Sequence, residues 1–148
     1  MITYQHILFA SDLSPESITI GKKARAIAQQ HNATLSIAHV IDYAPLIYGG
    51  GEFATPINTT LEETLEKQAK ASLRQQGEEL EIPEDQQWTP MGNTKNEIVQ
   101  LAQQIHADLI VIGAHDRHGF ALLLGSTANA IIHTLPCDVL TIRVSENQ

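Results

Sequence analysis

The chain has 148 residues, 43% of them hydrophobic, and its 9 Lys and Arg against 17 Asp and Glu give a formal net charge of -8. This length and composition suit a globular fold with a sizeable core, so we expect a single domain over residues 1–148. The acidic balance disfavours binding along a nucleic-acid backbone, and no apolar run is long enough to predict a membrane-spanning helix.

The amino-terminal part predicts a buried strand and then a helix. Residues 6–10 form a short apolar run, which is typical of a strand covered on both faces. Ser14 as N-cap, Pro15 at the first helical position and Glu16 in the first turn indicate a helix start. Apolar residues then recur at helical spacing, so we expect this helix to continue to about Asn32.

Asp12 directly follows the first predicted strand. In open α/β sheets, ligands meet the carboxyl ends of the strands, which is where this residue falls. A carboxylate at this point accepts hydrogen bonds either from the hydroxyls of a ribose or from backbone N–H groups of its own turn. The residues alone leave both roles open.

Residues 34–41 predict the second strand, and their alternation suggests that one face is less deeply covered. Val40 and Ile41 close this strand and are placed to form an apolar wall against a flat base. From residue 42 to residue 58 the chain is irregular, with prolines and three consecutive glycines. A loop of this length is either mobile or functional, and it either folds over a ligand or packs against a partner subunit.

The middle of the chain predicts two helices around a marginal strand. Residues 59–74 form a capped amphipathic pattern, and residues 95–106 place their apolar positions along one helical face. Between them, residues 87–91 make a weak strand. Pro90 restricts this strand to the margin of the sheet, because proline lacks the N–H group that internal pairing needs.

The most informative stretch spans residues 108–127. The apolar run 109–112, followed by Gly113, predicts a buried parallel strand. A glycine-containing loop leads from it to Ser126 and Thr127, which begin an apolar-periodic helix. The first N–H groups of a helix lack intrahelical partners and favour an anion, of which phosphate is the obvious candidate. The other interpretation is a capped helix without a ligand.

Two common phosphate-binding fingerprints are excluded. The P-loop pattern G-x-x-x-x-G-K-[ST] fails because the spacing from Gly119 to Gly125 is one residue too long and no lysine precedes Ser126. The dinucleotide pattern G-x-G-x-x-G is absent both from this loop and from the segment after the first strand. Any anion in this loop is therefore held in another way.

The end of the chain predicts one more strand, over residues 139–144, which is either a tolerated edge or a pairing surface for a second copy. Cys137, the single cysteine, is interpreted as a small buried hydrophobe. The 7 histidines show no metal-ligand spacing with cysteine or carboxylate, so no structural metal is expected. Residues 1–6 lack the features of a secretion signal, which favours the cytoplasm.

These five strands alternate with helices, which predicts an α/β fold with a five-stranded parallel sheet and helices on both faces. The pattern does not determine the strand order. A doubly wound order with its switch point between the first and fourth strands would bring Asp12 and the loop 113–127 to one crevice.

The chain resembles the universal stress protein A superfamily over nearly its whole length. The resemblance implies an adenine-nucleotide-binding type of α/β fold with strand order 3-2-1-4-5, a homodimer through the last strand, and a cytoplasmic role in the stress response. The segments that carry it are residues 6–8 and 12–17, His39-Val40, Gly92, residues 108–113, residues 125–129 and residues 137–140.

The family members that bind ATP or AMP carry a motif of the form G-x-x-G-x9-G-[ST]. Gly113 matches the first glycine, and Gly125 with Ser126 matches the closing pair. Asp116 stands at the second glycine, and only eight residues separate it from Gly125. The resemblance links this shorter spacing to the A-type branch, some of whose members lack nucleotide binding. A carboxylate here also repels phosphate.

The resemblance further implies that Asp12 binds ribose, that Val40 contacts adenine, and that the glycine loop holds phosphate. The residues expected to bind AMP, or ATP with Mg²⁺, are Ala10, Ser11, Asp12, Val40, Ile112, Gly113, His115, Asp116, Arg117, His118, Gly125, Ser126 and Thr127. Because no nucleophile with an orienting carboxylate is assignable, we expect a sensor or chaperone-like module with at most slow ATP hydrolysis. The alternative is a dimeric interaction protein that has lost nucleotide binding.

Overall fold

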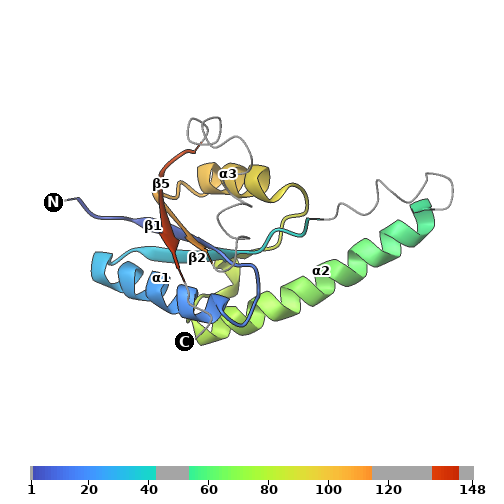
Figure 1. Cartoon of the computed structure of the whole chain (residues 1–148), viewed down its shortest axis with the longest axis horizontal. Helices are drawn as coiled ribbons and strands as arrows, with labels where there is room; N and C mark the ends of the chain where they lie inside the picture. Colours follow the sequence, from blue (N-terminus) through green and yellow to red (C-terminus); the bar gives the residue numbers. More distant parts are fainter. Residues whose placement is uncertain (1, 43–53, 115–134, 144–148) are drawn as a thin grey trace.

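The computed structural model describes residues 2–42, 54–114 and 135–143, with side chains in the second range from residue 61 onward. Strands and helices alternate along these residues (Figure 1). In chain order the elements are β1 (His6–Ala10), α1 (Ser17–His31), β2 (Thr34–Ala38), α2 (Ala54–Glu79), the 3₁₀ helix η2 (Glu84–Gln86), β3 (Gln87–Trp88), α3 (Thr94–Gln104), β4 (Leu109–Gly113) and β5 (Asp138–Ile142).

The five strands form one parallel sheet in the order β3-β2-β1-β4-β5. This confirms the predicted α/β fold and the strand order that the resemblance implied. Phe9, in the middle strand, lies beside Ile37 of β2 and Val111 of β4. The chain order reverses between β1 and β4, so the switch point lies where it was expected, and ligands of such sheets bind at this place.

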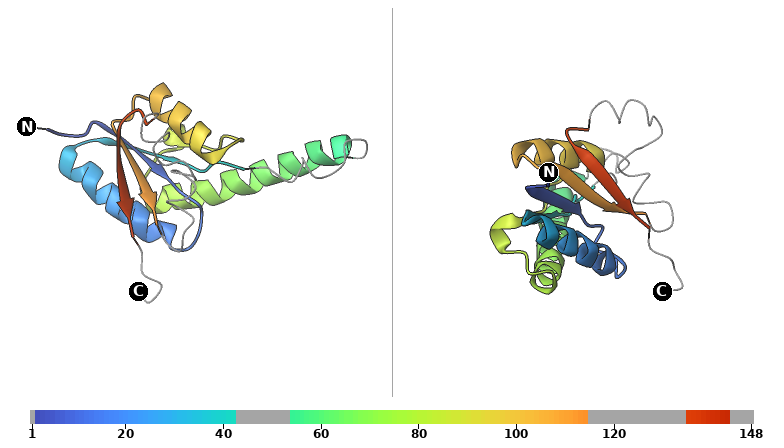
Figure 2. Two further views of the ribbon diagram at one scale, coloured as in Figure 1. Left: turned by 45° about the horizontal axis from the view of Figure 1, so that its top comes forward. Right: turned by 90° about the vertical axis from the view of Figure 1, so that its left-hand side faces the viewer.

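Two cores cover the two faces of the sheet. The side chains of β1 alternate, so that Ile7 and Phe9 enter the core under α1 and α2, while Leu8 enters the core under α3. Figure 2 shows α1 and the end of α2 on one face and α3 on the other. Helices on both faces explain why Ile110 and Val111 of β4 are fully buried although they point in opposite directions.

The start of α1 differs from the prediction. The helix begins at Ser17 rather than at Pro15, and its N-cap is Glu16, whose side chain makes no capping hydrogen bond. Ser14 belongs to a preceding turn instead, where its N–H donates to Oδ1 of Asp12 at 2.9 Å. The Ser14 carbonyl accepts the N–H of Ser17 at 3.0 Å as well as the Ser17 hydroxyl, which makes a tight turn before the regular helix begins.

The helix α2 is longer at both ends than the predicted range 59–74. Pro56 was taken as part of an irregular segment, but it lies in the first turn of α2, where a missing N–H costs no hydrogen bond. The inner part of the helix packs on the sheet through the buried Leu73 and Ala69. The outer part extends beyond the sheet (Figure 1), and Leu61 is 42% exposed there. The predicted loop residues 43–53 lie outside the described residues.

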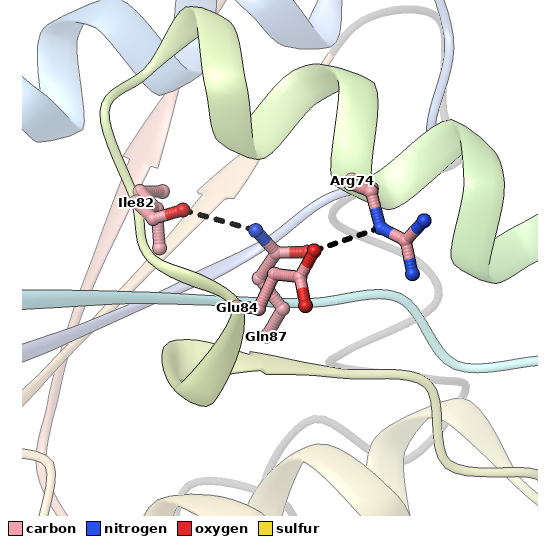
Figure 3. Close-up of polar contacts among 4 residues, drawn as sticks. All are labelled: Arg74, Ile82, Glu84 and Gln87. Atoms are coloured by element: carbon pink, nitrogen blue, oxygen red, sulfur yellow. Dashed lines mark hydrogen bonds and ion pairs between the residues drawn. The ribbon is translucent and has the colours of Figure 1, made fainter.

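Polar contacts fix the connection from α2 to the edge strand β3 (Figure 3). The Gln87 side-chain Nε2 donates to the Ile82 carbonyl at 2.9 Å, and Arg74 Nε lies 3.1 Å from Glu84 Oε1. A β-carbon at Gly77 would overlap the amide of Gln87. A side chain at this position would therefore displace the Gln87 amide from the Ile82 carbonyl.

Two predicted strands are shorter in the structure. The strand expected over residues 34–41 ends at Ala38, and Ile41 makes only an isolated bridge with Met91. The prediction that one face of this strand is less deeply covered is wrong, because residues 35–38 are all buried between the two helical layers. The strand expected over residues 87–91 is reduced to two residues, but it does lie at the margin of the sheet.

At the other edge of the sheet, β5 spans Asp138–Ile142. Its side chains alternate between the two faces of the sheet, since Leu140 and Ile142 join the core under α1 while Val139 joins the core under α3. None of the helices that the structure describes is both long and apolar enough to cross a membrane.

Cys137 lies before β5, half-buried against the core under α3, as the small-hydrophobe interpretation predicted. Burial raises the pKa of its thiol to about 11, and the carboxylates of Asp138 and Asp108 act in the same direction. The reactive form of cysteine is the thiolate, of which roughly 0.1% would exist at pH 8, against about a quarter for an ordinary thiol. The group is therefore poorly reactive.

We expect iodoacetamide at pH 8 to alkylate Cys137 at least about tenfold more slowly in the folded protein than in urea, because unfolding removes the burial that suppresses the thiolate. The folded-state rate should keep rising through pH 9 and 10 without a plateau. Mass spectrometry at timed intervals measures both rates. Equal rates in the two states, or a plateau near pH 9, would contradict the raised pKa of Cys137.

Candidate functional site

The turn after β1 forms one wall of the candidate site. Ser11 is buried, and its N–H donates to the Ala38 carbonyl at 2.8 Å, which ties the turn to the end of β2. Asp12 follows and is exposed. Its Oδ1 accepts the Ser14 N–H, so the Asx turn proposed for this residue exists.

The end of β2 forms the second wall. Nδ1 of His39 lies 2.9 Å from the Ser11 carbonyl. A carbonyl only accepts, so Nδ1 carries the proton and, in the neutral ring, Nε2 is an acceptor. The next residue, Val40, is 7% exposed and belongs to the core under α3. The strand end therefore provides an apolar surface beside a polar ring.

The end of β4 and the start of α3 complete the site. Ile112 and Gly113 are the last two residues of β4, and both are buried. The Asn93 side chain caps α3 by accepting the Asn96 N–H at 3.0 Å, as its type and position allow. Thr94, the first residue of this capped helix, lines the space beyond the strands.

A cavity of about 80 Å³ lies where these segments meet. It is mainly apolar, and the titratable side chains among its described lining residues are Asp12 and His39. The lining residues are Phe9, Ala10, Ser11, Asp12, Ser17, Ile20, Ala38, His39, Val40, Thr94, Ile98, Ile112 and Gly113.

The structure brings together six of the predicted site residues, all of which line this cavity. They are Ala10, Ser11, Asp12, Val40, Ile112 and Gly113. Three segments far apart in the sequence thus meet at the predicted switch point, while the binding role of each residue stays a prediction. The other predicted site residues lie outside the described residues: His115, Asp116, Arg117, His118, Gly125, Ser126 and Thr127.

Several lining residues were not predicted as site residues. His39 had a usable signal, because it precedes Val40 at the carboxyl end of a predicted strand. Thr94 had a weaker one, because it follows a good helix cap. Ser17 and Ile98 lie on the inner faces of α1 and α3, and only the packing of these helices on the sheet brings them to the cavity.

The described residues of the site suit ligand binding better than catalysis. The cavity is mainly apolar, and Asp12 and His39, whose side chains can accept hydrogen bonds, are among its lining residues. Across residues 2–42, 54–114 and 135–143, no group of three or more His, Cys, Asp or Glu side chains could hold a metal ion. The arrangement suits a ligand with a flat apolar part and hydroxyl or amino donors.

The fold and the cavity define a doubly wound α/β protein with a cavity at its switch point, where ligands of such sheets bind. The sequence profile described as the Universal stress protein family matches residues 3–143. The chain belongs to the universal stress protein family, which confirms the resemblance seen in its sequence.

Individual relatives agree with this membership. Universal stress protein A homolog 1 of Coxiella burnetii (strain RSA 493 / Nine Mile phase I) is 44% identical over 143 residues, which cover 97% of this chain and 99% of the relative. The universal stress protein UspA from Lactobacillus plantarum has a solved structure that is 27% identical, covers 97% of this chain and 100% of its own, and gives a TM-score of 0.70.

A second solved structure is a universal stress protein in complex with cAMP. It is 25% identical, covers 97% of this chain and 100% of its own, and gives a TM-score of 0.63. Its ligand is an adenine nucleotide. A protein similar in fold and length therefore binds a molecule of the class that the sequence motifs suggested here.

Proposed function

We propose that this universal stress protein binds AMP or ATP in the cavity at the ends of β1, β2 and β4. In this role it is a sensor or chaperone-like module of the cytoplasmic stress response, with little or no nucleotide turnover. The observation that carries the proposal is the meeting of Asp12, Val40 and Gly113 around one mainly apolar cavity. These residues come from three strand ends, and the family resemblance implies a nucleotide contact for each of them.

The cavity suits the base of the nucleotide. Its volume of about 80 Å³ is several times the roughly 10–15 Å³ that one buried water needs. Val40 follows β2 and Ile112 lies at the end of β4, and both give apolar surface to the cavity, where a planar ring loses its contact with water. Base burial is thus the main source of affinity in this proposal.

The ribose and phosphates account for the remaining predicted residues. The Asp12 carboxylate accepts hydrogen bonds from the ribose hydroxyls, and Gly113 lets the chain leave β4 close to the ligand. The phosphates, with Mg²⁺ when the ligand is ATP, are assigned to the segment that contains Gly125, Ser126 and Thr127. The structure of a relative in complex with cAMP supports the choice of an adenine nucleotide.

A thermal denaturation series tests the proposal. At a ligand concentration 100 times the dissociation constant, binding to the folded state alone adds about 2.7 kcal/mol to the free energy of unfolding. We expect AMP or ATP to raise the melting temperature, and GMP, as a control for the phosphate and ribose, to raise it less. ATP should be measured with and without Mg²⁺. No shift at millimolar adenine nucleotide would contradict the proposal.

The second candidate function is a dimeric interaction protein without a nucleotide. Asp116 favours it, because a carboxylate replaces a motif glycine where phosphate would approach. The proposed dimer forms through β5, which is an edge strand of the sheet formed by the described residues, and edge strands are general sites of pairing with a second chain. Sedimentation equilibrium, run with and without AMP, separates the candidates: a dimer that no nucleotide stabilises would favour the second.

A further inference from the structure

A buried glutamine of α2 contacts the turn that carries Asp12. Gln76 is only 8% exposed, although it lies on a helix whose neighbouring residues 74 and 75 are exposed. Its side chain lies between those of Ser11 and Ser17, which are 6% and 1% exposed. Three polar side chains are thus removed from water together, which is costly unless each is hydrogen-bonded.

Each of these groups has a hydrogen-bond partner. The Ser11 hydroxyl donates to Oε1 of Gln76 at 2.8 Å, and Nε2 of Gln76 donates to Oγ of Ser17 at 2.6 Å. The Ser17 hydroxyl in turn donates to the Ser14 carbonyl, and the Leu13 N–H donates to Oγ of Ser11 at 3.0 Å. A primary amide is well suited to this position, because it offers an acceptor and a donor at the same time.

The network holds both ends of the turn between β1 and α1. Ser11 begins the turn and Ser17 begins the helix, and Asp12 lies between them. The turn also contains Leu13 at a φ of 62°, a left-handed conformation that is unfavourable for leucine. Such a conformation persists only when the surroundings enforce it. Here the Ser11 hydroxyl accepts the N–H of Leu13 itself, and Gln76 fixes that hydroxyl.

We propose that Gln76 is a positioning residue for the ligand site, because its amide holds the turn that presents Asp12 to the cavity. This inference depends on the proposed nucleotide function for its effect on affinity. Its effect on the turn is independent of any ligand. The long helix α2 is thereby part of the site, although Gln76 itself does not line the cavity.

The first measurement is hydrogen exchange without a ligand. In Gln76→Met, which has a similar volume but no hydrogen-bonding amide, we expect the Leu13 amide to exchange at least about tenfold faster than in the wild-type protein, while β4 amides keep their protection. Gln75→Met is the matched control, since residue 75 is exposed on the same helix. Unchanged protection at Leu13 would overturn the inference, whether or not the protein binds nucleotide.

The second measurement is the dissociation constant of AMP, by calorimetry, relative to wild type at the same pH. We expect Gln76→Met to bind at least about tenfold more weakly at every pH. Gln76→Glu should approach wild type near pH 5 and weaken by pH 8. A protonated carboxyl keeps one donor and one acceptor, whereas a carboxylate only accepts. The β4 amides, which keep their protection when only the turn is released, distinguish this local effect from a general loss of stability.

The outcomes of the two measurements separate this inference from the function. If wild type does not bind AMP or ATP, the proposed function fails, and the exchange of the Leu13 amide still decides whether Gln76 holds the turn. If wild type binds and both Gln76 variants bind equally well at pH 8, the positioning role is wrong and the function stands. Faster exchange of the Leu13 amide, together with the recovery of AMP binding at low pH in Gln76→Glu, supports both the positioning role and the proposed function.

Discussion

Replacing Phe9 by alanine is expected to lower the free energy of unfolding by about 3–5 kcal/mol, which is the usual cost of removing a buried aromatic ring from a core. Phe9 has no exposed surface and lies in the middle strand of the sheet. Its ring reaches across to α1, where a β-carbon on Gly21 would come within 2.9 Å of it. The cavity left by alanine is bounded by strands on both sides and cannot easily collapse.

Urea unfolding without nucleotide measures this loss, and it is large against the roughly 5–15 kcal/mol that stabilises a typical domain. Ile2→Ala is the control, because Ile2 is 93% exposed and surface changes usually stay within about 0.5 kcal/mol. A loss below about 1 kcal/mol in Phe9→Ala would show that the core under α1 is not packed as the structure describes.

The second large effect concerns Asp12 and the affinity for AMP. Hydrogen bonds to a charged group contribute about 1.5–3 kcal/mol each, so removing the carboxylate should weaken AMP binding about 10- to 100-fold. Asp12→Asn retains an oxygen that can accept the Ser14 N–H, so it preserves the Asx turn. Asp12→Ala removes the turn as well, and it should also lower the melting temperature.

Calorimetric titration of both variants separates the two roles of Asp12. Glu16→Gln is the matched control, because it removes the same charge from an exposed position near the turn that does not line the cavity. If Asp12→Asn binds AMP as tightly as wild type while Asp12→Ala does not, the carboxylate only shapes the turn. The assignment of Asp12 to the ribose would then be wrong.

The sheet and its switch point could be predicted because their signals are local. Residues 7–9 and 109–112 are short apolar runs, and a run of this kind has few alternatives to a strand buried on both faces. The site residues that end these strands could be found by the same reasoning, since ligands bind at carboxyl strand ends. Asp12, Val40 and Gly113 are of this type, and all three line the cavity.

The features that escaped prediction depend on particular polar contacts, some local and some between distant residues. The start of α1 shifted because the Ser14 carbonyl accepts the N–H and the hydroxyl of Ser17 in a turn that precedes the helix. In the sequence, Gln76 resembles an ordinary surface residue of a helix. Its burial becomes clear only from its hydrogen bonds to Ser11 and Ser17, which are about sixty residues away. The spacing of apolar residues along the sequence does not indicate such a partner, because it carries no information about hydrogen bonds between polar side chains.

The pairing of β1 with β4 has a consequence for how this chain is made. Ile7 lies beside Leu109 in the register of these two strands, so the centre of the sheet joins segments about a hundred residues apart. At a synthesis rate of roughly 5–20 residues per second, β1 leaves the ribosome some 5–20 s before β4 does. During that time the nascent chain carries an apolar strand with one open side, which makes early association with a chaperone advantageous.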